Sequence, residues 1–169
     1  MNKHLNNPFN PTNQIHMNNI EQGDINENQV LEWLNKKNNL YIKDTSDRDR
    51  APMDFINEND KIKIELKSSN YNSSELSELM ISASKFQEML NDKSNTKYVY
   101  YLMKDGLFGW KFDPQKFSTD CRKDISIRTD RGKNEHLLVI KILTKKFIKI
   151  TDEIKCISVV DDDDDECLL

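Results

Sequence analysis

The sequence has few glycines and few cysteines, and it lacks a long apolar run. Only four of its 169 residues are glycine, and no glycine-rich phosphate-binding loop is present. The three cysteines (Cys121, Cys156 and Cys167) are odd in number and widely spaced, which argues against a disulfide framework and a cysteine-based zinc site. No apolar stretch approaches the roughly 18 residues of a membrane helix. These absences exclude a P-loop enzyme, a zinc ribbon and a membrane-spanning protein.

The N-terminal residues also lack a charged segment followed by an apolar one, the pattern of a secretory signal. We therefore expect an intracellular protein of the cytoplasm or nucleus, cellular or viral, that is not secreted and has no membrane partner. Hydrophobic residues make up 36% of the chain and charged residues 32%, which allows one modest core. A length of 169 residues suits one domain with tails.

The charge is unevenly distributed. The net charge is −4, but residues 161–166 supply six acids, and without them 25 basic residues face 23 acidic ones. Residues 1–20 hold seven asparagines, two prolines and no acid, a composition that cannot build a core alone. We predict a flexible lead-in over 1–20, an α/β domain over 21–160 and an acidic tail over 161–169. The tail is solvated, or it is a decoy that competes with nucleic acid for a basic surface.

The first half of the domain predicts a helix followed by a hairpin. Apolar residues at helical spacing indicate a helix that ends near Lys37, with Asp24 or Asn26 as its cap. A short strand is expected over 40–42. Residues 53–56 and 61–67 then form two arms around a turn at 57–60, and the second arm alternates strictly between apolar and charged residues.

The second half of the domain has a less regular pattern of apolar and polar residues. Residues 75–91 have a mostly helical pattern, although a capping box beginning at Ser84 would also start a fresh helix there. Further strands are expected over 98–103, 107–112, 124–128, 136–143, 147–150 and 154–160, with a turn at 130–133. This order predicts an α/β domain with a mixed central sheet flanked by helices.

Three charged residues of the predicted hairpin suit phosphodiester hydrolysis. That reaction needs charge stabilisation at the phosphate and an activated water, both of which a hard divalent cation with oxygen ligands provides. If the hairpin closes, Asp54 and Glu65 could supply two carboxylates on adjacent strands. Lys67 shares a strand face with Glu65, roughly 6–7 Å further along, where an ammonium can orient the water. The Leu66 carbonyl is a candidate further ligand, and Glu27 a candidate outer carboxylate.

This arrangement resembles the PD-(D/E)xK nuclease superfamily. The resemblance rests on Pro52-Met53-Asp54, on Glu65-Leu66-Lys67 followed by Ser68, and on the helices before and after them. It covers about residues 24–112, and the family's shorter motif has proline directly before the aspartate, where Met53 intervenes here. The C-terminal third resembles no family.

The resemblance implies a restriction-endonuclease-like core, here with extra C-terminal strands, and metal-dependent cleavage of DNA or, less often, RNA. It implies that Asp54 and Glu65 bind Mg²⁺ or Mn²⁺ and that Lys67 is catalytic. It places the first-helix acid of the family on Glu27. A lysine or glutamine of the second helix often supports such a site, so the resemblance makes Lys85 and Gln87 candidates.

Each of these residues also has a purely structural interpretation. Charged side chains on one sheet face are commonly solvated, Lys85 could be a surface lysine, and Glu27 could serve the helix dipole. Without the acidic tail the chain is nearly neutral, which predicts modest affinity for DNA. A structured substrate, a protein partner or a second copy of the chain is therefore expected to supply the remaining affinity. Four C-terminal lysines are candidates for that contact: Lys141, Lys145, Lys146 and Lys149. The alternative function is a non-catalytic nucleic-acid-binding or assembly subunit.

Overall fold

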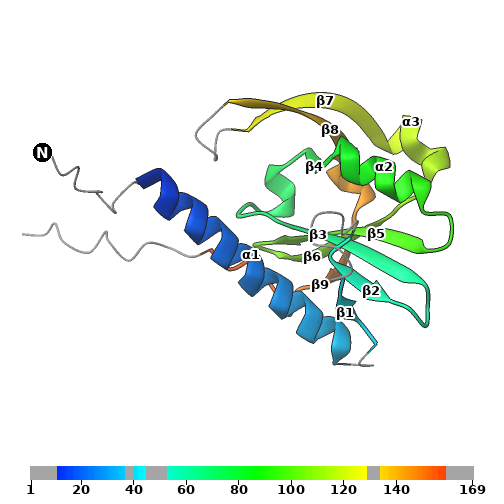
Figure 1. Ribbon diagram of the computed structural model, residues 1–169, viewed down its shortest axis with the longest axis horizontal. Coiled ribbons are helices and arrows are strands. Elements are labelled where there is room, and N and C mark those ends of the chain that lie inside the picture. The colour runs from blue at the N-terminus through cyan, green and yellow to red at the C-terminus, as the bar shows by residue number, and fades with distance from the viewer. Residues whose placement is uncertain (1–10, 37–39, 45–52, 129–133, 159–169) are drawn as a thin grey trace, which may run out of the picture.

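The computed structural model describes residues 11–36, 40–44, 53–128 and 134–158 (Figure 1). The helices are α1 (Pro11–Asn35), α2 (Ala83–Asn91) and α3 (Phe117–Asp120), with 3₁₀ turns η1 (Ser73–Glu75), η2 (Pro114–Lys116) and η3 (Thr144–Lys146). The strands are β1 (Ile42–Lys43), β2 (Phe55–Asn57), β3 (Ile62–Ser68), β4 (Glu78–Ser82), β5 (Thr96–Met103), β6 (Gly106–Lys111), β7 (Cys121–Arg128), β8 (Glu135–Leu143) and β9 (Ile148–Thr151).

The strands form a large mixed sheet and a small antiparallel one. The large sheet has six strands in the order β1-β2-β3-β5-β6-β9, and the small sheet has three in the order β4-β8-β7. Strands β3 and β5 are parallel, while the other neighbours in the large sheet are antiparallel. The prediction of an α/β domain with a mixed sheet and helices is therefore confirmed.

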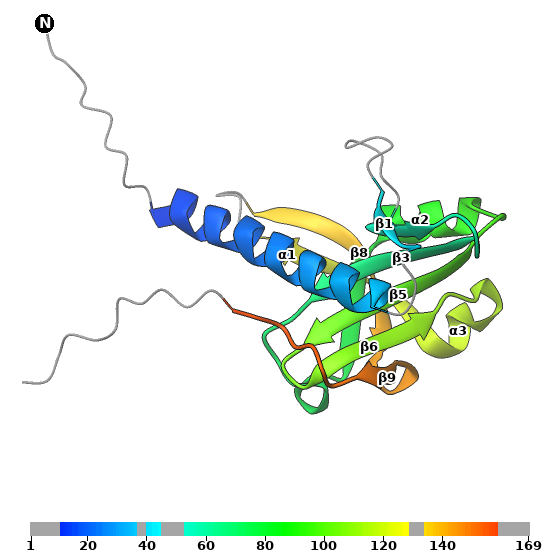
Figure 2. The ribbon, with the colours of Figure 1, turned by 90° about the horizontal axis from the view of Figure 1, so that it is seen from below.

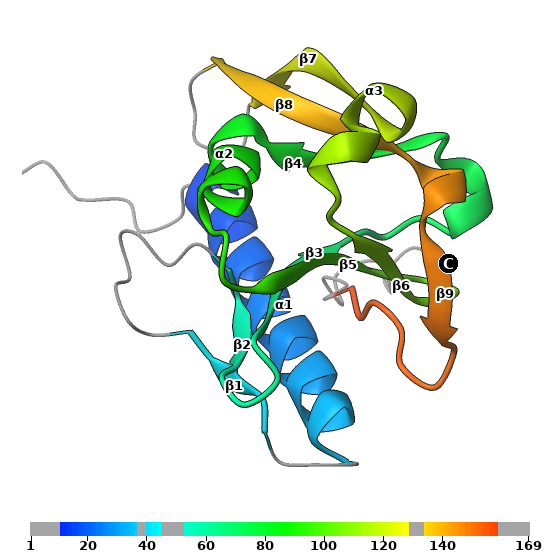
Figure 3. The same cartoon turned by 90° about the vertical axis from the view of Figure 1, so that its right-hand side faces the viewer.

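The large sheet is buried on both faces (Figures 2 and 3). Helix α1 covers one face, where Val30 packs with Phe55, Ile64 and Leu66. Helix α2 and the small sheet cover the other face, where they bury a larger cluster that includes Trp110. Alternating strand residues point to opposite faces, so the charged positions of β3 face α2 and the small sheet.

Helix α1 is longer than predicted. It begins at Pro11, so residues 11–20, which we assigned to a flexible lead-in, are helical. The fixed φ of proline suits the first turn of a helix, and helix formation is cooperative, so turns anchored around buried Val30 extend toward the N-terminus. Neither Asp24 nor Asn26 is a cap, because both lie inside the helix. Residues 1–10 lie outside the described part of the chain.

The segment predicted as a helix over 75–91 divides into a strand and a helix. Residues 78–82 form β4, in which Leu79 and Ile81 are buried and Met80 between them is exposed. Pairing with β8 overrides the helical spacing of this segment. Helix α2 then starts at Ala83, and its cap is Ser82 rather than Ser84, since the Ser82 hydroxyl accepts the Lys85 N–H at 3.3 Å.

The strand predicted over 154–160 is also absent from the described residues 154–158. The backbone of this segment bonds mostly to side chains of α1, and only the Cys156 N–H donates to a strand among the described residues, to the Met103 carbonyl of β5 at 2.9 Å. Asn26 Oδ1 accepts the Ile157 N–H at 3.0 Å, and Gln29 bonds both the carbonyl and the N–H of Lys155. Because these side chains satisfy the backbone, the segment needs no strand partner. The predicted turn at 130–133, the end of this strand and the tail over 161–169 include residues outside the described part.

Candidate active site

The β2–β3 hairpin brings Asp54 beside the second half of β3. The Asp54 N–H donates to the Ile64 carbonyl at 2.9 Å, which ties the residue before β2 to β3 although the register partner of Ile64 is Phe55. Asp54 Oδ2 then accepts the Leu66 N–H at 2.6 Å. The N–H and C=O of a strand residue point to the same side, so the Leu66 carbonyl also faces the Asp54 edge. The predicted hairpin geometry is confirmed at these residues.

Glu65 lies at the centre of the cluster. Its side chain is fully buried, with 0% exposed. Glu65 Oε1 lies 2.6 Å from Lys67 Nζ, and Glu65 Oε2 lies 3.1 Å from Lys85 Nζ. A buried carboxylate needs compensating charge, and these two ammonium groups supply it from β3 and α2. The interpretation of this strand face as a solvated surface is therefore wrong.

Burial and like charge act together on Asp54. They raise its pKa to about 6: burial contributes most, followed by the negative charge of Glu65. The hydrogen bond from Leu66 and the charge of Lys67 oppose that rise, and Glu27 adds to it. A carboxyl group with a pKa near neutrality beside a second carboxylate is typical of a functional site.

Lys67 stands between the buried cluster and solvent. Its side chain is 39% exposed although the ammonium contacts buried Glu65. Burial alone would lower the pKa of Lys67, but the charge and hydrogen bond of Glu65 outweigh it, so the pKa is raised and the ammonium stays protonated at neutral pH. The side chain borders a hollow of about 430 Å³, here called the Lys67 hollow, whose lining also includes Ser68, Met80, Ser82, Tyr101 and Val139.

Tyr101 is a part of this site that the sequence analysis did not single out. It is the cross-strand partner of Lys67, so the two side chains share a sheet face. Its hydroxyl accepts the Met80 N–H at 3.0 Å and donates to the Met80 carbonyl, which attaches β4 to β5 beside Lys67. The aromatic run over 98–103 was the available signal, but only the parallel register shows which tyrosine meets Lys67.

The candidates from the two helices behave differently. Lys85 reaches Glu65, whereas Gln87 is turned away on α2 and donates to Asn91 at 3.1 Å. Residues two apart on a helix point in different directions, so the structure brings Lys85 and not Gln87 to the cluster. Glu27 forms an ion pair with Lys43 at 3.4 Å and acts on Asp54 through its charge.

The site contains oxygen donors of the kind that a hard cation prefers. Asp54 and Glu65 are close enough for the charge of one to affect the other, the Leu66 carbonyl lies on the Asp54 side of β3, and Mg²⁺ commonly takes one or two carboxylates and keeps several waters. Burial raises the pKa of Asp54 most and the negative charge of Glu65 raises it further, and a cation would relieve that repulsion. Across the described part of the chain, no group of three or more His, Cys, Asp or Glu side chains is arranged to hold a metal. Glu27 is paired with Lys43 here, and its role as an outer carboxylate stays a prediction.

The ion pair of Lys85 can be tested through stability. We expect Lys85→Met to lower the free energy of unfolding by about 1–3 kcal/mol, because one oxygen of buried Glu65 loses its partner. Urea denaturation at pH 7 measures this loss. Lys93→Met, at an exposed lysine after the same helix, is the control and is expected to change stability by less than about 0.5 kcal/mol. Equal losses in the two variants would contradict the prediction.

Comparison of the chain with family models, curated proteins and solved structures finds no match. No helix within the described residues has the length and apolar character needed to cross a membrane.

Proposed function

We propose that this protein is a metal-dependent nuclease of the PD-(D/E)xK type that hydrolyses phosphodiester bonds in DNA. One observation carries the proposal: Glu65 is fully buried between Lys67 and Lys85 and lies beside Asp54. Buried ion clusters of this kind contribute little to stability compared with apolar packing, so their presence calls for a chemical reason. The residues of the cluster are those that the superfamily resemblance implies.

The arrangement of strands supports the same proposal. The resemblance implies a four-stranded mixed sheet flanked by helices. Strands β1, β2, β3 and β5 are consecutive neighbours, with β3 parallel to β5, and α1 and α2 lie on opposite faces. We propose that these elements are a restriction-endonuclease-like core, to which β6, β9 and the small sheet are additions.

Each residue of the cluster has a different role in the proposed hydrolysis. A bound Mg²⁺ or Mn²⁺, held by Asp54, Glu65 and the Leu66 carbonyl, would supply Lewis acidity and a water of lowered pKa. Lys67 carries a partly exposed, protonated ammonium that can hydrogen-bond the attacking water or a phosphate oxygen. Lys85 holds Glu65 in a fixed orientation from α2. The Lys67 hollow leaves this ammonium accessible to the substrate.

The decisive test is cleavage of a labelled DNA panel by the wild-type protein. The panel contains single-stranded, duplex, flap and four-way-junction DNA, with a matched RNA, each incubated with EDTA, Mg²⁺ or Mn²⁺. The proposal expects cleavage that requires the metal. The absence of cleavage on every substrate, together with the absence of metal binding in calorimetry, would refute it.

The pKa of Asp54 sets an expected pH dependence. Protonated Asp54 cannot serve as an anionic metal ligand, and its pKa is about 6 because of burial and Glu65. At subsaturating Mg²⁺ we expect the cleavage rate to rise about tenfold per pH unit below pH 6 and to level off above it. Saturating Mg²⁺ competes with the proton and should move the midpoint to lower pH. A pH midpoint of the cleavage rate that does not change with the Mg²⁺ concentration would contradict the assignment of Asp54 as a metal ligand.

A second function is favoured by a different observation. Both oxygens of Glu65 are already neutralised by lysines, and exposed apolar residues lie on the β7–β8 arm, at Ile125, Ile127 and Leu138. These features suit a non-catalytic binding or assembly subunit, in which a protein partner covers the arm. Such a subunit would bind DNA or its partner equally well in EDTA and in Mg²⁺, whereas the nuclease binds the metal through Asp54.

A further inference from the structure

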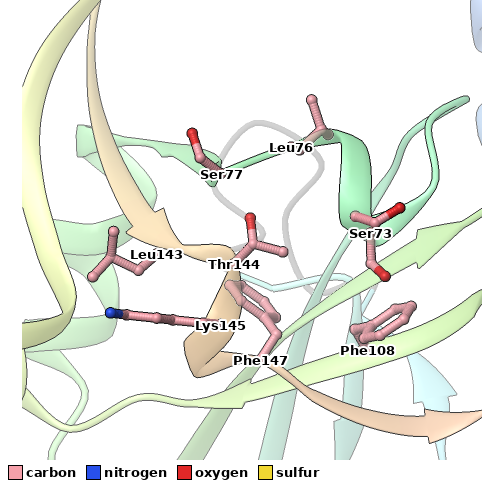
Figure 4. Close-up of a pocket in the computed structure, with 9 residues that line it drawn as sticks. Ser73, Leu76, Ser77, Phe108, Leu143, Thr144, Lys145 and Phe147 are labelled. Atoms are coloured by element: carbon pink, nitrogen blue, oxygen red, sulfur yellow. The ribbon is translucent and has the colours of Figure 1, made fainter.

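A second hollow, of about 550 Å³, lies between η1, β6 and η3 (Figure 4). Its apolar lining includes the rings of Phe108 and Phe147, and we call it the phenyl hollow. Serine and threonine hydroxyls and one lysine complete the lining, at Ser73, Ser74, Ser77, Thr144 and Lys145. A hollow of this size with an apolar lining and a few polar groups is typical of small-ligand sites.

The phenyl hollow lies beside the proposed catalytic cluster. Lys67 pairs with Tyr101, and Tyr101 pairs with Phe108, so the three side chains share one face of three adjacent strands. Neighbouring strands are about 5 Å apart, which puts the backbones of Lys67 and Phe108 about 10 Å from each other. The ring of Tyr101 lines the Lys67 hollow and contacts Phe147, with centroids 5.7 Å apart, and Phe147 in turn lines the phenyl hollow. One nucleic acid strand at Lys67 can therefore extend to the phenyl hollow.

The polar groups around this hollow have unused hydrogen-bonding capacity. Thr144 Oγ1 is buried and finds no hydrogen-bond partner among the described residues, an arrangement that folded proteins avoid unless a ligand or water completes it. The Ser73 hydroxyl donates to Asp105, which leaves its own oxygen free to accept. Lys149 lies over the Phe108 ring, 5.8 Å from its centroid.

The four C-terminal lysines are not equivalent. Lys141 pairs with Asp124 at 2.7 Å and Lys146 pairs with Asp120 at 2.9 Å, so neither is a free contact for phosphate. Lys145 is exposed and lines the phenyl hollow, and Lys149 flanks it. The phenyl rings suit a flat aromatic ring, the hydroxyls suit hydrogen-bonding groups on its edge, and the two lysines suit an attached anion.

We infer that the phenyl hollow binds one unpaired nucleotide of the DNA strand that the catalytic cluster cuts. The inference rests on the proposed nuclease function and names its substrate class, which is DNA with a single-stranded segment next to the cut. The base packs against the phenyl rings, Thr144 bonds its edge or sugar, and Lys145 contacts a phosphate. A base inside a duplex is stacked and paired, so only an unpaired or flipped base enters such a hollow.

The first test fills the hollow from its rim. Ser77 is exposed, and its backbone carbonyl, which accepts the Thr144 N–H, is kept in Ser77→Tyr. We expect Ser77→Tyr to weaken binding of a fluorescein-labelled eight-nucleotide single strand about tenfold in EDTA, where no cleavage occurs, and to leave binding of a blunt duplex unchanged. Ser118→Tyr, at an exposed serine of α3, is the matched control and should bind both probes as the wild type does.

The second test removes single polar groups. We expect Thr144→Val and Lys145→Ala each to weaken single-strand binding about three- to tenfold. Lys145→Ala should also reduce the slope of the logarithm of affinity against the logarithm of salt concentration by about one. Lys93→Ala, at an exposed lysine outside the hollow, is the control. Unchanged single-strand affinity in Ser77→Tyr and Lys145→Ala would overturn the inference.

The outcomes separate the inference from the function on which it rests. Metal-dependent cleavage that is equal in wild type and Ser77→Tyr on flap DNA overturns the subsite and leaves the nuclease intact. Single-strand binding that Ser77→Tyr weakens, in a protein that neither cuts any substrate nor binds metal in calorimetry, supports the subsite and refutes the nuclease. Equal weakening of single-strand and duplex binding by Ser77→Tyr overturns the subsite, because a nucleotide pocket is selective for the unpaired base.

Discussion

Replacing Lys67 by alanine is expected to lower the rate of metal-dependent DNA cleavage about 100- to 1000-fold. Lys67 combines a protonated ammonium with an accessible position beside the buried carboxylate of Glu65. Loss of one charged hydrogen-bond donor at a reacting phosphate is worth a factor of this order. Single-turnover cleavage of the preferred DNA at saturating Mg²⁺ measures the effect. Affinity for the same DNA in EDTA should change less than threefold, because the other contacts remain.

The same strand provides a matched control. Lys63 lies on the same face of β3 but pairs with Asp92 at 3.1 Å, away from Glu65. Lys63→Ala removes one lysine and one ion pair, so it is expected to cleave at a rate within threefold of the wild type. Circular dichroism and urea denaturation check that both variants fold. If the two variants lose activity equally, or if Lys67→Ala retains full activity, Lys67 has no catalytic role.

The sequence predicted the parts of this site that depend on local pattern. Strict alternation over residues 61–67 and the turn before it were sufficient to place Asp54 beside β3 and to put Glu65 and Lys67 on one face. These inferences needed only strand geometry and neighbours close in sequence. Lys85 became a candidate differently, through the resemblance to the PD-(D/E)xK superfamily, which implies a lysine or glutamine of the second helix.

The rest depends on contacts between distant segments. The alternating pattern of its strand predicts that Glu65 is solvated. It is buried because β4 and α2 cover that face of the sheet. Residues 78–82 have helical spacing and become a strand because β8, about 60 residues later, pairs with them. Asn26 resembles a helix cap, and its actual partner is Ile157. No pattern within a short window contains such information.

A conflict between stability and function follows from the buried cluster. The fold holds two carboxylates, Asp54 and Glu65, in a partly dehydrated corner where they repel each other, and two lysines compensate only Glu65 directly. Asp54 receives one backbone hydrogen bond, from Leu66. In the absence of a cation, the charge on Asp54 therefore destabilises the folded protein, and this effect can be measured without any assay of cleavage.

We expect Asp54→Asn to stabilise the protein at pH 8, by about 3 kcal/mol at most, while abolishing cleavage. Burial and Glu65 raise the pKa of Asp54 from 3.8 to about 6, and each pKa unit corresponds to about 1.4 kcal/mol. The folded state binds the proton more tightly than the unfolded state, so the contribution of Asp54 to stability falls as pH rises from about 4 to 6. Asparagine keeps the acceptor for the Leu66 N–H without the charge. The advantage of the variant should therefore be full above pH 6 and vanish below pH 4.

Mg²⁺ provides the second half of this test. A cation between Asp54 and Glu65 relieves the repulsion that the variant removes, so saturating Mg²⁺ should raise the Tm of the wild type by several degrees and leave that of Asp54→Asn nearly unchanged. Glu58→Gln, at an exposed acid in the turn of the same hairpin, is the control and should respond to Mg²⁺ as the wild type does. Equal Mg²⁺ shifts in wild type and Asp54→Asn would mean that the metal binds elsewhere. A variant that is no more stable than the wild type at pH 8 would mean that the Asp54 charge is not penalised, and the raised pKa on which the site assignment depends would be wrong.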